Sequence, residues 1–327
     1  MNNSLTFSDR IDLIRYGIYG VEGVILLLFN SLLFYSICKY EALTALKEYL
    51  IIAGLALVDA SNGLAALSAA LYRIPLILSH RNRMLVSDWY CFTTVHNLIW
   101  TFAFPVQGLM LLAVSLDRFL SVFRPADYSG FSRRYAFCIL TAVYVFGVGC
   151  AVVGGVTVFH DESQNVGAIC LTAWALKPEV YRFLYVIQNS GTFGSILLYV
   201  LVIIFYRKRK AKVQVPQAAK AFLKRQRNLT KSVGISCLFT ALFFGLPNVI
   251  ILVAHTAFHV GFYFINVWAY IISNINPALN LLIYWRKEQD LRMAIRSALK
   301  CKSLPPLLSL WHHHKQPAKT KSERVPK

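Results

Sequence analysis

Seven stretches of this chain are each long and apolar enough to cross a lipid bilayer as a helix. They run approximately over residues 16–38, 49–71, 95–117, 135–158, 183–206, 232–255 and 261–284. A spanning helix needs about 20 mostly apolar residues. A backbone in lipid must satisfy its own hydrogen bonds, which leaves helices or a closed barrel, and these stretches are too continuous for barrel strands. The sequence therefore predicts an all-α membrane protein with a bundle of seven transmembrane helices.

The segments around this bundle divide the chain into four parts. We expect an extracellular N-terminal tail over residues 1–15, the membrane domain over 16–284, a short helix over 285–300 and a disordered cytoplasmic tail over 301–327. In the short helix, Leu291, Ile295 and Leu299 recur every four residues, and charged residues fall largely on other faces. This spacing predicts an amphipathic helix that lies along the inner membrane surface.

The distribution of basic residues predicts the orientation in the membrane. With the N-terminus outside, the inner loops and tail hold most of the 34 Lys and Arg residues, and segment 207–231 is rich in them without a single Asp or Glu. Cytoplasmic loops carry such an excess. We therefore expect a multi-pass protein of the plasma membrane with an extracellular N-terminus. The net charge of +19 lies beside the spans and forms no separate domain, so it indicates contact with membrane lipid and no nucleic acid.

Four residues are candidates for covalent modification. Cys91 and Cys170 are the only two cysteines expected on the oxidising outer side, which favours a disulfide over two free thiols. The bond would pin loop 159–182 to the third helix, at a gain of roughly 4 kcal/mol on the chain-entropy model. Cys301 is a candidate for palmitoylation, with an ordinary reduced cysteine as the alternative. Asn2, in Asn-Asn-Ser, is a candidate for glycosylation.

Asp59 is an ionisable residue in the middle of the second predicted span. A charge at this depth costs at least ~2.5 kcal/mol, so such residues are functional candidates by default. The alternative is a polar contact that serves only helix association.

Several short motifs carry a resemblance to a known family. The third span ends in Asp117-Arg118-Phe119, and Arg124-Pro125 follows. This pattern resembles the signature of rhodopsin-like (class A) G-protein-coupled receptors, and Asn30, Asp59 and the spacing of Asn280 and Tyr284 resemble further motifs of that class. The loss of the tryptophan before Pro247 and the Arg286-Lys287 ending resemble nematode serpentine chemosensory receptors, the Srsx class in particular.

The resemblance implies a chemosensory receptor that binds a small organic molecule in its outer half and activates a heterotrimeric G protein. The implied switch residues are Asp117, Arg118, Phe119, Tyr206, Pro247, Pro277, Asn280 and Tyr284. For Tyr206, the alternative is an aromatic residue at the membrane boundary. The implied polar core, where class A receptors hold a sodium ion, comprises Asn30, Asp59, Gln107, Asn276 and Asn280. Gln107 stands where the family usually has Ser, and we expect no cofactor beyond this candidate ion.

The sequence also departs from the family pattern in two places that matter for switching. Leu281 stands where proline is usual, and Pro277 lies one turn earlier, which should loosen the seventh helix around Ser273. No acid occupies position 227, where Arg227 is found. Arg118 is therefore expected to pair with Asp117 alone, which predicts appreciable activity without ligand.

The outer halves of the spans contain candidates for a ligand pocket. They are His96, Asn97, Trp100, Gln188, Asn189, Asn248 and Trp268. An aromatic cavity with a few polar groups suits a small organic molecule, although packing alone also explains such residues. In the resemblance, Trp100 stands where amine receptors carry an aspartate, and Asn274 where light receptors carry the lysine that binds retinal. Neither of those ligand classes is expected.

Two other functional classes remain as alternatives. A membrane transporter or channel would use Asp59 and Gln107 in its pathway, but charged rings and paired broken helices are not evident. A membrane enzyme would need a catalytic motif, and neither His-Glu-x-x-His nor Gly-x-Ser-x-Gly occurs. The run His312-His313-His314 has no partner ligands. We expect no catalytic residues and no metal site.

Overall fold

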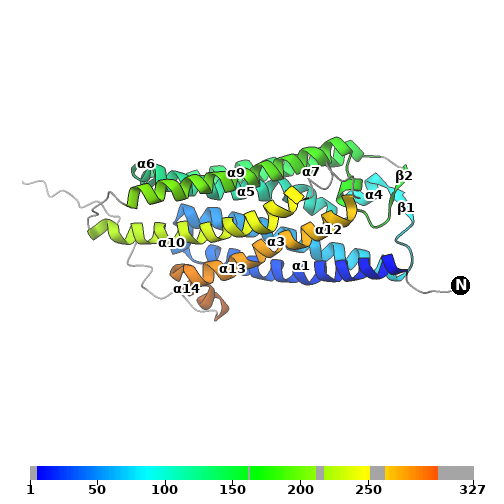
Figure 1. The fold of residues 1–327 in the computed structure, drawn as a ribbon, viewed down its shortest axis with the longest axis horizontal. Coiled ribbons are helices and arrows are strands. Elements are labelled where there is room, and N and C mark those ends of the chain that lie inside the picture. Colours follow the sequence, from blue (N-terminus) through cyan, green and yellow to red (C-terminus); the bar gives the residue numbers. More distant parts are fainter. Residues whose placement is uncertain (1–5, 161–162, 211–216, 251–261, 301–327) are drawn as a thin grey trace, which may run out of the picture.

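The long helices of the protein lie side by side along one axis. The computed structural model describes residues 6–160, 163–210, 217–250 and 262–300. Within these residues, six helices are long and apolar enough to cross a membrane. They are α1 (Phe7–Lys39), α3 (Lys47–Leu78), α5 (Val95–Phe123), α7 (Arg133–Val158), α9 (Pro178–Lys210) and α10 (Gln217–Thr240), which continues through the π-helix η1 (Ala241–Gly245) (Figure 1). Each of the first five predicted spans lies within one of these helices, and the sixth, 232–255, begins in α10 and is described as far as residue 250.

The seventh predicted span consists of two helices. They are α12 (Phe262–Ser273) and α13 (Ile275–Lys287), and Asn274 separates them. Pro277 has no N–H to donate to the carbonyl of Ser273, which explains a break one turn before the proline. The expected loosening around Ser273 is therefore present, whereas a single continuous seventh helix is not.

Short elements close the two ends of the bundle. One end carries the strands β1 (Leu85–Ser87) and β2 (Gln164–Gly167), which form an antiparallel pair, together with α4 (Asp88–Thr93) and α8 (Thr172–Ala175). We call it the disulfide end. The opposite end carries α2 (Glu41–Thr44), α6 (Pro125–Gly130) and α14 (Gln289–Leu299), and we call it the Arg118 end (Figure 1).

Helix α1 begins within the predicted N-terminal tail of residues 1–15. Thr6 caps it, because the Thr6 side chain accepts a hydrogen bond from the Asp9 backbone while the Asp9 carboxylate accepts one from the Thr6 backbone. This reciprocal pair satisfies two N–H groups that a helix start otherwise leaves unpaired. The start of the helix therefore precedes the start of the apolar stretch.

Helix α14 only partly follows its predicted pattern. Leu291 and Ile295 are buried, together with Ala294 and Ala298, in an apolar cluster that includes residues of α1 and α13. Leu299, predicted to share this face, is 62% exposed. Arg286 and Lys287 belong to α13, so the helix is also shorter than the predicted range 285–300. Its placement along a membrane surface stays a prediction.

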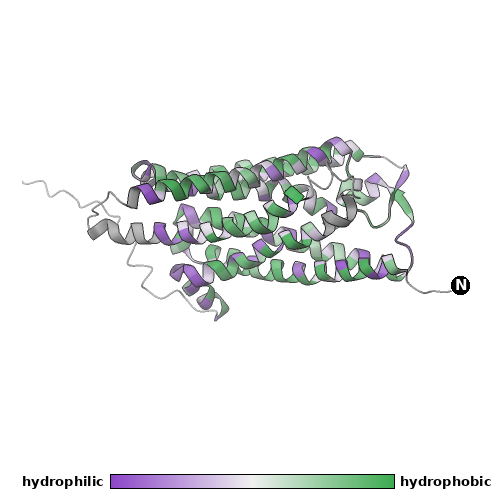
Figure 2. Cartoon of the chain, viewed as in Figure 1, coloured by the Kyte–Doolittle hydropathy of each residue, from purple (hydrophilic) through white to green (hydrophobic). Residues whose placement is uncertain are grey.

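The outward surfaces of the helices are apolar. Helix α7 has the highest mean hydropathy of the six, 2.4 over its most apolar window, yet only 17% of that window is buried. Val148, Val152 and Val156 are more than half exposed. Figure 2 shows hydrophobic residues along the middle of the long helices and hydrophilic residues concentrated toward both ends. An apolar surface of this extent requires lipid around it.

Glycine residues allow two helix pairs to approach very closely. An added Cβ at Gly63 of α3 would lie 2.6 Å from the backbone nitrogen of Leu27 in α1. An added Cβ at Gly191 of α9 would lie 2.5 Å from the carbonyl carbon of Gly108 in α5. Small residues at such contacts bring backbones together, which is how helices gain packing energy in lipid. These contacts fix α3 and α9, which carry part of the candidate site described below.

We expect Gly191→Ala to destabilise the bundle by about 1–3 kcal/mol, because the methyl group meets backbone atoms that cannot move without displacing a helix. The measurement is the midpoint of thermal unfolding in detergent. Gly149→Ala is the matched control, since an added Cβ there has nothing within 4 Å and both sites lie in helices. Equal midpoints for the two variants would contradict the close-contact explanation.

Candidate functional site

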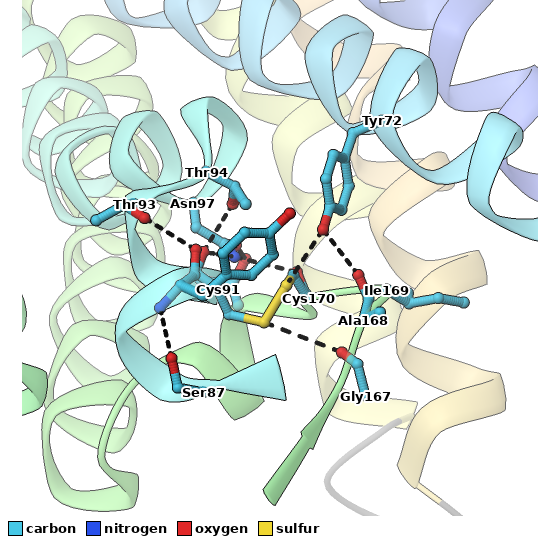
Figure 3. The surroundings of a disulfide bond; sticks show 12 residues. Tyr72, Ser87, Cys91, Thr93, Thr94, Asn97, Gly167, Ala168, Ile169 and Cys170 are labelled. Carbon is cyan, nitrogen blue, oxygen red and sulfur yellow. Dashed lines mark hydrogen bonds between the residues drawn. A yellow bond between two sulfur atoms is a disulfide. The ribbon is translucent and has the colours of Figure 1, made fainter. Parts of the chain in front are cut away.

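A disulfide holds the loop after β2 against the bundle. Cys91 of α4 is bonded to Cys170, as the sequence predicts. Arg73 of α3 reinforces the same position, because its Nε donates to the Ile169 carbonyl at 2.9 Å and its Nη2 to the Cys170 carbonyl at 2.9 Å. Tyr72 donates to the Ala168 carbonyl at 3.0 Å (Figure 3). The loop is thereby fixed over the disulfide end of the helices.

His96 and Asn97 contact this loop, and neither lines the cavity described below. Asn97 Nδ2 donates to the carbonyls of Cys91 at 2.8 Å and Cys170 at 3.1 Å, and its Oδ1 accepts from the Thr172 hydroxyl at 2.7 Å. His96 Nε2 lies 3.3 Å from the Cys170 carbonyl oxygen. Both side chains are buried. Their contacts are those of residues that hold the loop in place.

A cavity of about 380 Å³ opens beneath the loop. Trp100, Gln188 and Asn248, three of the seven predicted pocket residues, line it. His96, Asn97, Asn189 and Trp268 do not. Asn189 Nδ2 donates to the Tyr185 carbonyl at 2.8 Å, and the ring of Trp268 lies 5.8 Å from the Arg15 guanidinium. Helix position alone places these residues in the outer half of the bundle but does not say which way each side chain points.

Aromatic residues form much of the cavity wall. The Trp100 indole N–H donates to the Tyr270 hydroxyl at 2.8 Å, and the two rings meet edge to face. On the other side, the Tyr185 hydroxyl donates to Asn248 Oδ1 at 3.1 Å. Residues 171–174, immediately after the disulfide, form part of the lining. The cavity combines flat apolar walls with a few fixed polar groups, the composition of a small-molecule site.

The polar core lies at the floor of the cavity. Gln107, which lines the cavity, donates from Nε2 to Asp59 Oδ1 at 3.0 Å. Asn280 Nδ2 donates to Asp59 Oδ2 at 3.2 Å, and Asn280 Oδ1 accepts from the Ser236 hydroxyl of α10 at 2.8 Å. Asp59 is therefore linked to α5, α13 and, through Asn280, to α10.

Two predicted members of the polar core bond elsewhere. Asn276, also at the cavity floor, donates to the Thr240 hydroxyl at 2.7 Å. Asn30 donates to the carbonyls of Leu26 at 3.1 Å and Pro277 at 3.4 Å. Asn276 therefore ties α13 to the end of α10, and Asn30 ties α1 to the proline of the broken seventh helix.

The arrangement around Asp59 does not fit a bound sodium ion. A hard cation needs several oxygen ligands facing it. Both carboxylate oxygens of Asp59 instead accept amide N–H groups, one from Gln107 and one from Asn280. The long side chain of Gln107 brings a donor to the carboxylate where the family usually has a short hydroxyl.

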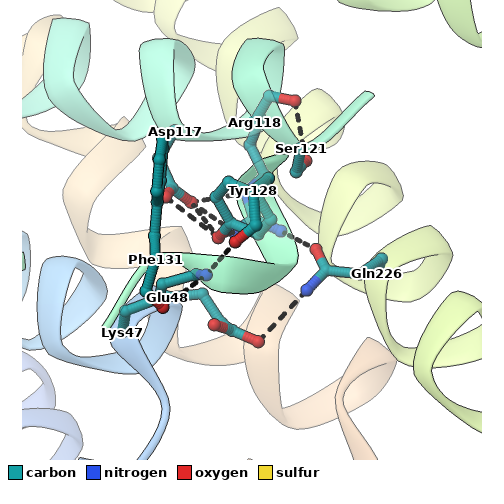
Figure 4. A network of polar contacts seen from close by, with 8 residues as sticks. All are labelled: Lys47, Glu48, Asp117, Arg118, Ser121, Tyr128, Phe131 and Gln226. Atoms are coloured by element: carbon teal, nitrogen blue, oxygen red, sulfur yellow. Dashed lines mark hydrogen bonds and ion pairs between the residues drawn. The ribbon is translucent and has the colours of Figure 1, made fainter. Parts of the chain in front are cut away.

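Asp117 and Arg118 form a buried ion pair within a larger network at the Arg118 end. Tyr128 of α6 donates to Asp117 Oδ1 at 3.0 Å and accepts from Arg118 Nη2 at 3.1 Å. Arg118 Nη1 donates to Gln226 Oε1 of α10 at 2.8 Å, and Gln226 Nε2 donates to Glu48 Oε1 of α3 at 3.2 Å (Figure 4). The expectation that Arg118 pairs with Asp117 alone is therefore wrong.

Tyr128 is itself held in place. The Lys47 ammonium lies 3.9 Å from the centre of the Tyr128 ring and donates to the carbonyls of Tyr128 and Phe131. Burial raises the pKa of the Tyr128 hydroxyl well above its usual range. The hydroxyl stays neutral and so can donate to Asp117 and accept from Arg118 at the same time.

Tyr199 is a tyrosine of α9 that reaches α10. The Tyr199 hydroxyl donates to the Thr230 carbonyl, and Gly234 has no side chain that would displace the ring. Tyr199 is buried, as is Tyr284, whereas Tyr206 is half-buried. The two α9 tyrosines are seven residues apart and so share one helix face, which is the signal that sequence reasoning overlooked.

Phe119, the third residue of the motif, packs away from the ionic network. Its ring stacks on Phe123 at 5.3 Å and meets Phe205 of α9 edge to face at 6.0 Å. Phe119 therefore connects α5 to α9 by apolar contact. Only the first two residues of the motif form the buried polar network.

The helix type changes just before Pro247, one of the implied switch residues. The π-helix η1 ends at Gly245, two residues before Pro247. Pro247 lacks the N–H of a regular turn, and a π-helical turn is a common way to accommodate such a gap. Thr240, bonded to Asn276, lies immediately before η1. A natural hinge therefore lies beside the cavity floor.

A bundle of apolar helices, a loop bonded over a central cavity and a buried arginine network at the far end define a serpentine membrane receptor. The chain matches the family model of the serpentine type 7TM GPCR chemoreceptor Srsx over residues 25–299. It belongs to this family, whose members are multi-pass receptors and not enzymes. No curated protein matches the chain.

We expect the double variant Cys91→Ser/Cys170→Ser to lose most of its surface expression, because the loop loses a bond worth roughly 4 kcal/mol. Flow cytometry of an epitope-tagged receptor measures this. Cys38→Ser is the control, since Cys38 is an exposed free thiol. Surface levels equal to those of the parent would show that the hydrogen bonds of the loop suffice without the disulfide.

We expect no sodium dependence in the parent receptor and a sodium-dependent rise in melting temperature in Gln107→Ser. The shorter side chain frees Asp59 Oδ1 and leaves room for an ion. At ten times its Kd, an ion would stabilise the fold by about 1.4 kcal/mol. The measurement compares NaCl with N-methylglucamine chloride at equal ionic strength. Adding Asp59→Asn should remove the effect, and a rise in the parent would contradict this account.

Proposed function

We propose that this receptor binds a small organic molecule in the cavity beneath residues 171–174 and activates a heterotrimeric G protein from its Arg118 end. The observation that carries the proposal is that α10 takes part in both regions. Thr240 lies at the cavity floor, and Gln226 of the same helix bonds Arg118. A molecule in the cavity can therefore act on the helix that restrains the arginine.

The polar contacts give a route for this action. Gln107 links the cavity to Asp59, Asp59 binds Asn280, and Asn280 binds Ser236 of α10. A ligand that displaces the Gln107 amide or the Asn276–Thr240 pair changes contacts that join α13 to α10. It shifts the equilibrium only by the difference in its affinity for the two states.

The motion we propose is a swing of the Arg118 end of α10 about η1 and Pro247. In the described state, Gln226 spans from Arg118 to Glu48 and holds α10 against α5 and α3. Breaking these two hydrogen bonds would free Arg118 and open a space between the helices for the G protein. Tyr199, Tyr284, Pro277 and Asn280 lie on the helices that border this space.

We further propose that the disulfide end is extracellular and that the receptor acts in the plasma membrane. The Cys91–Cys170 bond supports an oxidising location for that end. The Lys- and Arg-rich segment 207–231, which begins in the last turn of α9 and ends in α10, lies at the opposite end, which supports a cytoplasmic Arg118 end. Asn2 and Cys301 lie outside the described residues, and we retain them as candidate glycosylation and palmitoylation sites.

No observation favours a transporter or channel. A transporter or channel would need Asp59, together with Gln107, to face the pathway of the transported solute. Asp59 is 2% exposed and does not line the cavity, and both of its carboxylate oxygens accept hydrogen bonds from neighbouring helices. Its contacts are those of a residue that couples helices.

We expect Gln226→Ala to raise ligand-free nucleotide exchange several-fold. The variant removes a hydrogen bond to a charged group, worth about 1.5–3 kcal/mol, from the closed state alone. Exchange on a panel of purified Gα subunits, at matched receptor levels in nanodiscs, measures the effect. Arg227→Ala is the control, because Arg227 is the exposed neighbour of Gln226.

Arg118→Ala should abolish exchange in both the parent and the Gln226→Ala background, while folded receptor remains detectable. Normal exchange by Arg118→Ala would show that the Asp117–Arg118 pair is only structural. Unchanged basal exchange by Gln226→Ala would show that Gln226 does not restrain the closed state.

A further inference from the structure

Arg73 is a buried cation in the wall of the cavity. Its side chain is 2% exposed and lines the cavity together with Trp100 and Tyr19. The guanidinium lies 5.1 Å from the centre of the Tyr16 ring and 5.6 Å from that of Trp100. Nε and Nη2 donate to the loop carbonyls of Ile169 and Cys170, and Nη1 has no hydrogen-bond partner among the described residues. Arg73 therefore lines the cavity with one guanidinium nitrogen that donates to none of the described residues.

No carboxylate balances this charge in the described part of the chain. The ion pairs there join Arg15 to Asp12, Arg118 to Asp117, Arg124 to Asp127 and Lys177 to Asp88. No Asp or Glu is among the described residues that line the cavity. Glu22 of α1, the nearby acid on a facing helix, accepts from Asn274 Nδ2 at 3.0 Å. The carbonyls and aromatic rings offset the charge of Arg73 only in part.

We propose that Arg73 binds the anionic group of the ligand, and that the receptor recognises organic carboxylic acids with an apolar or aromatic body. The inference deepens the proposed function and rests on its placement of the ligand in the cavity. A carboxylate matches the planar guanidinium in shape and charge, and it supplies the acceptor that Nη1 lacks. The aromatic walls accept the apolar body.

The same charge argues against amines and uncharged molecules as preferred ligands. A cationic ligand would meet Arg73 without an acid to hold it, and an uncharged one would leave the buried guanidinium without its counter-ion. Gln188 and Asn248, which also line the cavity, are neutral and do not alter this balance. Electrostatics therefore select for one negative charge per ligand.

Arg73 also positions the loop, so its substitution has two separable effects. Loss of the bonds to Ile169 and Cys170 loosens the covering of the cavity for any ligand. Loss of the charge weakens binding of anions alone. Arg73→Gln removes the charge and keeps an amide donor, whereas Arg73→Lys keeps the charge and loses the planar group.

The experiment uses the purified full-length receptor in nanodiscs and a matched panel of probes. The panel contains straight-chain carboxylates of four to eight carbons and carboxylates that end in a phenyl group. For each carbon skeleton it also contains the methyl ester and the primary amine. Binding is measured as the concentration dependence of the melting temperature, and nucleotide exchange on Gα subunits is recorded in parallel. The same measurements are made on Arg73→Gln, Arg73→Lys and Asn248→Ala.

We expect at least one carboxylate to stabilise the parent receptor while its ester and amine do not. Arg73→Gln should bind that carboxylate at least about tenfold more weakly, as the loss of one charged hydrogen bond predicts. Arg73→Lys should retain part of the binding. The proposal is overturned if no carboxylate of the panel stabilises the parent, if an ester does so equally well, or if Arg73→Gln binds the acid as the parent does.

The parallel readouts separate this inference from the proposed function. An ester or amine that drives nucleotide exchange through the cavity, with a response lost in Asn248→Ala, would keep the receptor function and overturn the anion preference. A carboxylate that binds through Arg73 without driving exchange on any Gα subunit would support the anion site and overturn the proposed coupling.

Discussion

The cost of burying polar groups among apolar helices determines how this receptor is held together. Many polar side chains are buried in the described part of the bundle, and several of them join two or more helices. Asp59 receives one amide from α5 and one from α13, and Arg118 bonds α6 and α10 as well as its neighbour Asp117. Because lipid offers no hydrogen bonds, breaking such a contact is costly unless a new partner is supplied.

This constraint makes α10 the element most able to switch. Three of its polar contacts lie at successive levels, at Gln226, Ser236 and Thr240, each with a partner on a different helix or at a different depth. The first level faces the Arg118 network and the last faces the cavity. A π-helical turn follows the last level and gives the helix a place to bend. In the proposed function, ligand and G protein bias this one two-state element from opposite ends.

Sequence patterns predicted the features that depend on the length and order of apolar and polar segments, namely the spans and the disulfide. Apolar runs located the first six spans, and sidedness found the Cys91–Cys170 pair, since both follow from bulk partition between lipid, water and an oxidising side. Side-chain direction was harder to predict. Gln226 was missed because the family pattern points to the next position, 227. Tyr199 was missed because Tyr206, two turns away on the same helix, matches the family tyrosine. No sequence pattern indicates the burial of Arg73, since that burial depends on how a distant loop folds back.

Two of the buried arginines of the bundle, Arg118 and Arg73, show why partners matter more than burial. Arg118 and Arg73 are equally buried, and each contacts aromatic residues or carbonyls from another element. Arg118 has its compensating carboxylate next to it in the chain, so its charge is satisfied in the resting state and its release needs an outside partner. Arg73 has no such carboxylate among the described residues that line the cavity, so its charge has no counter-ion there. A ligand that fills it gains an interaction that the empty receptor cannot make, and that gain is the free energy available to shift α10.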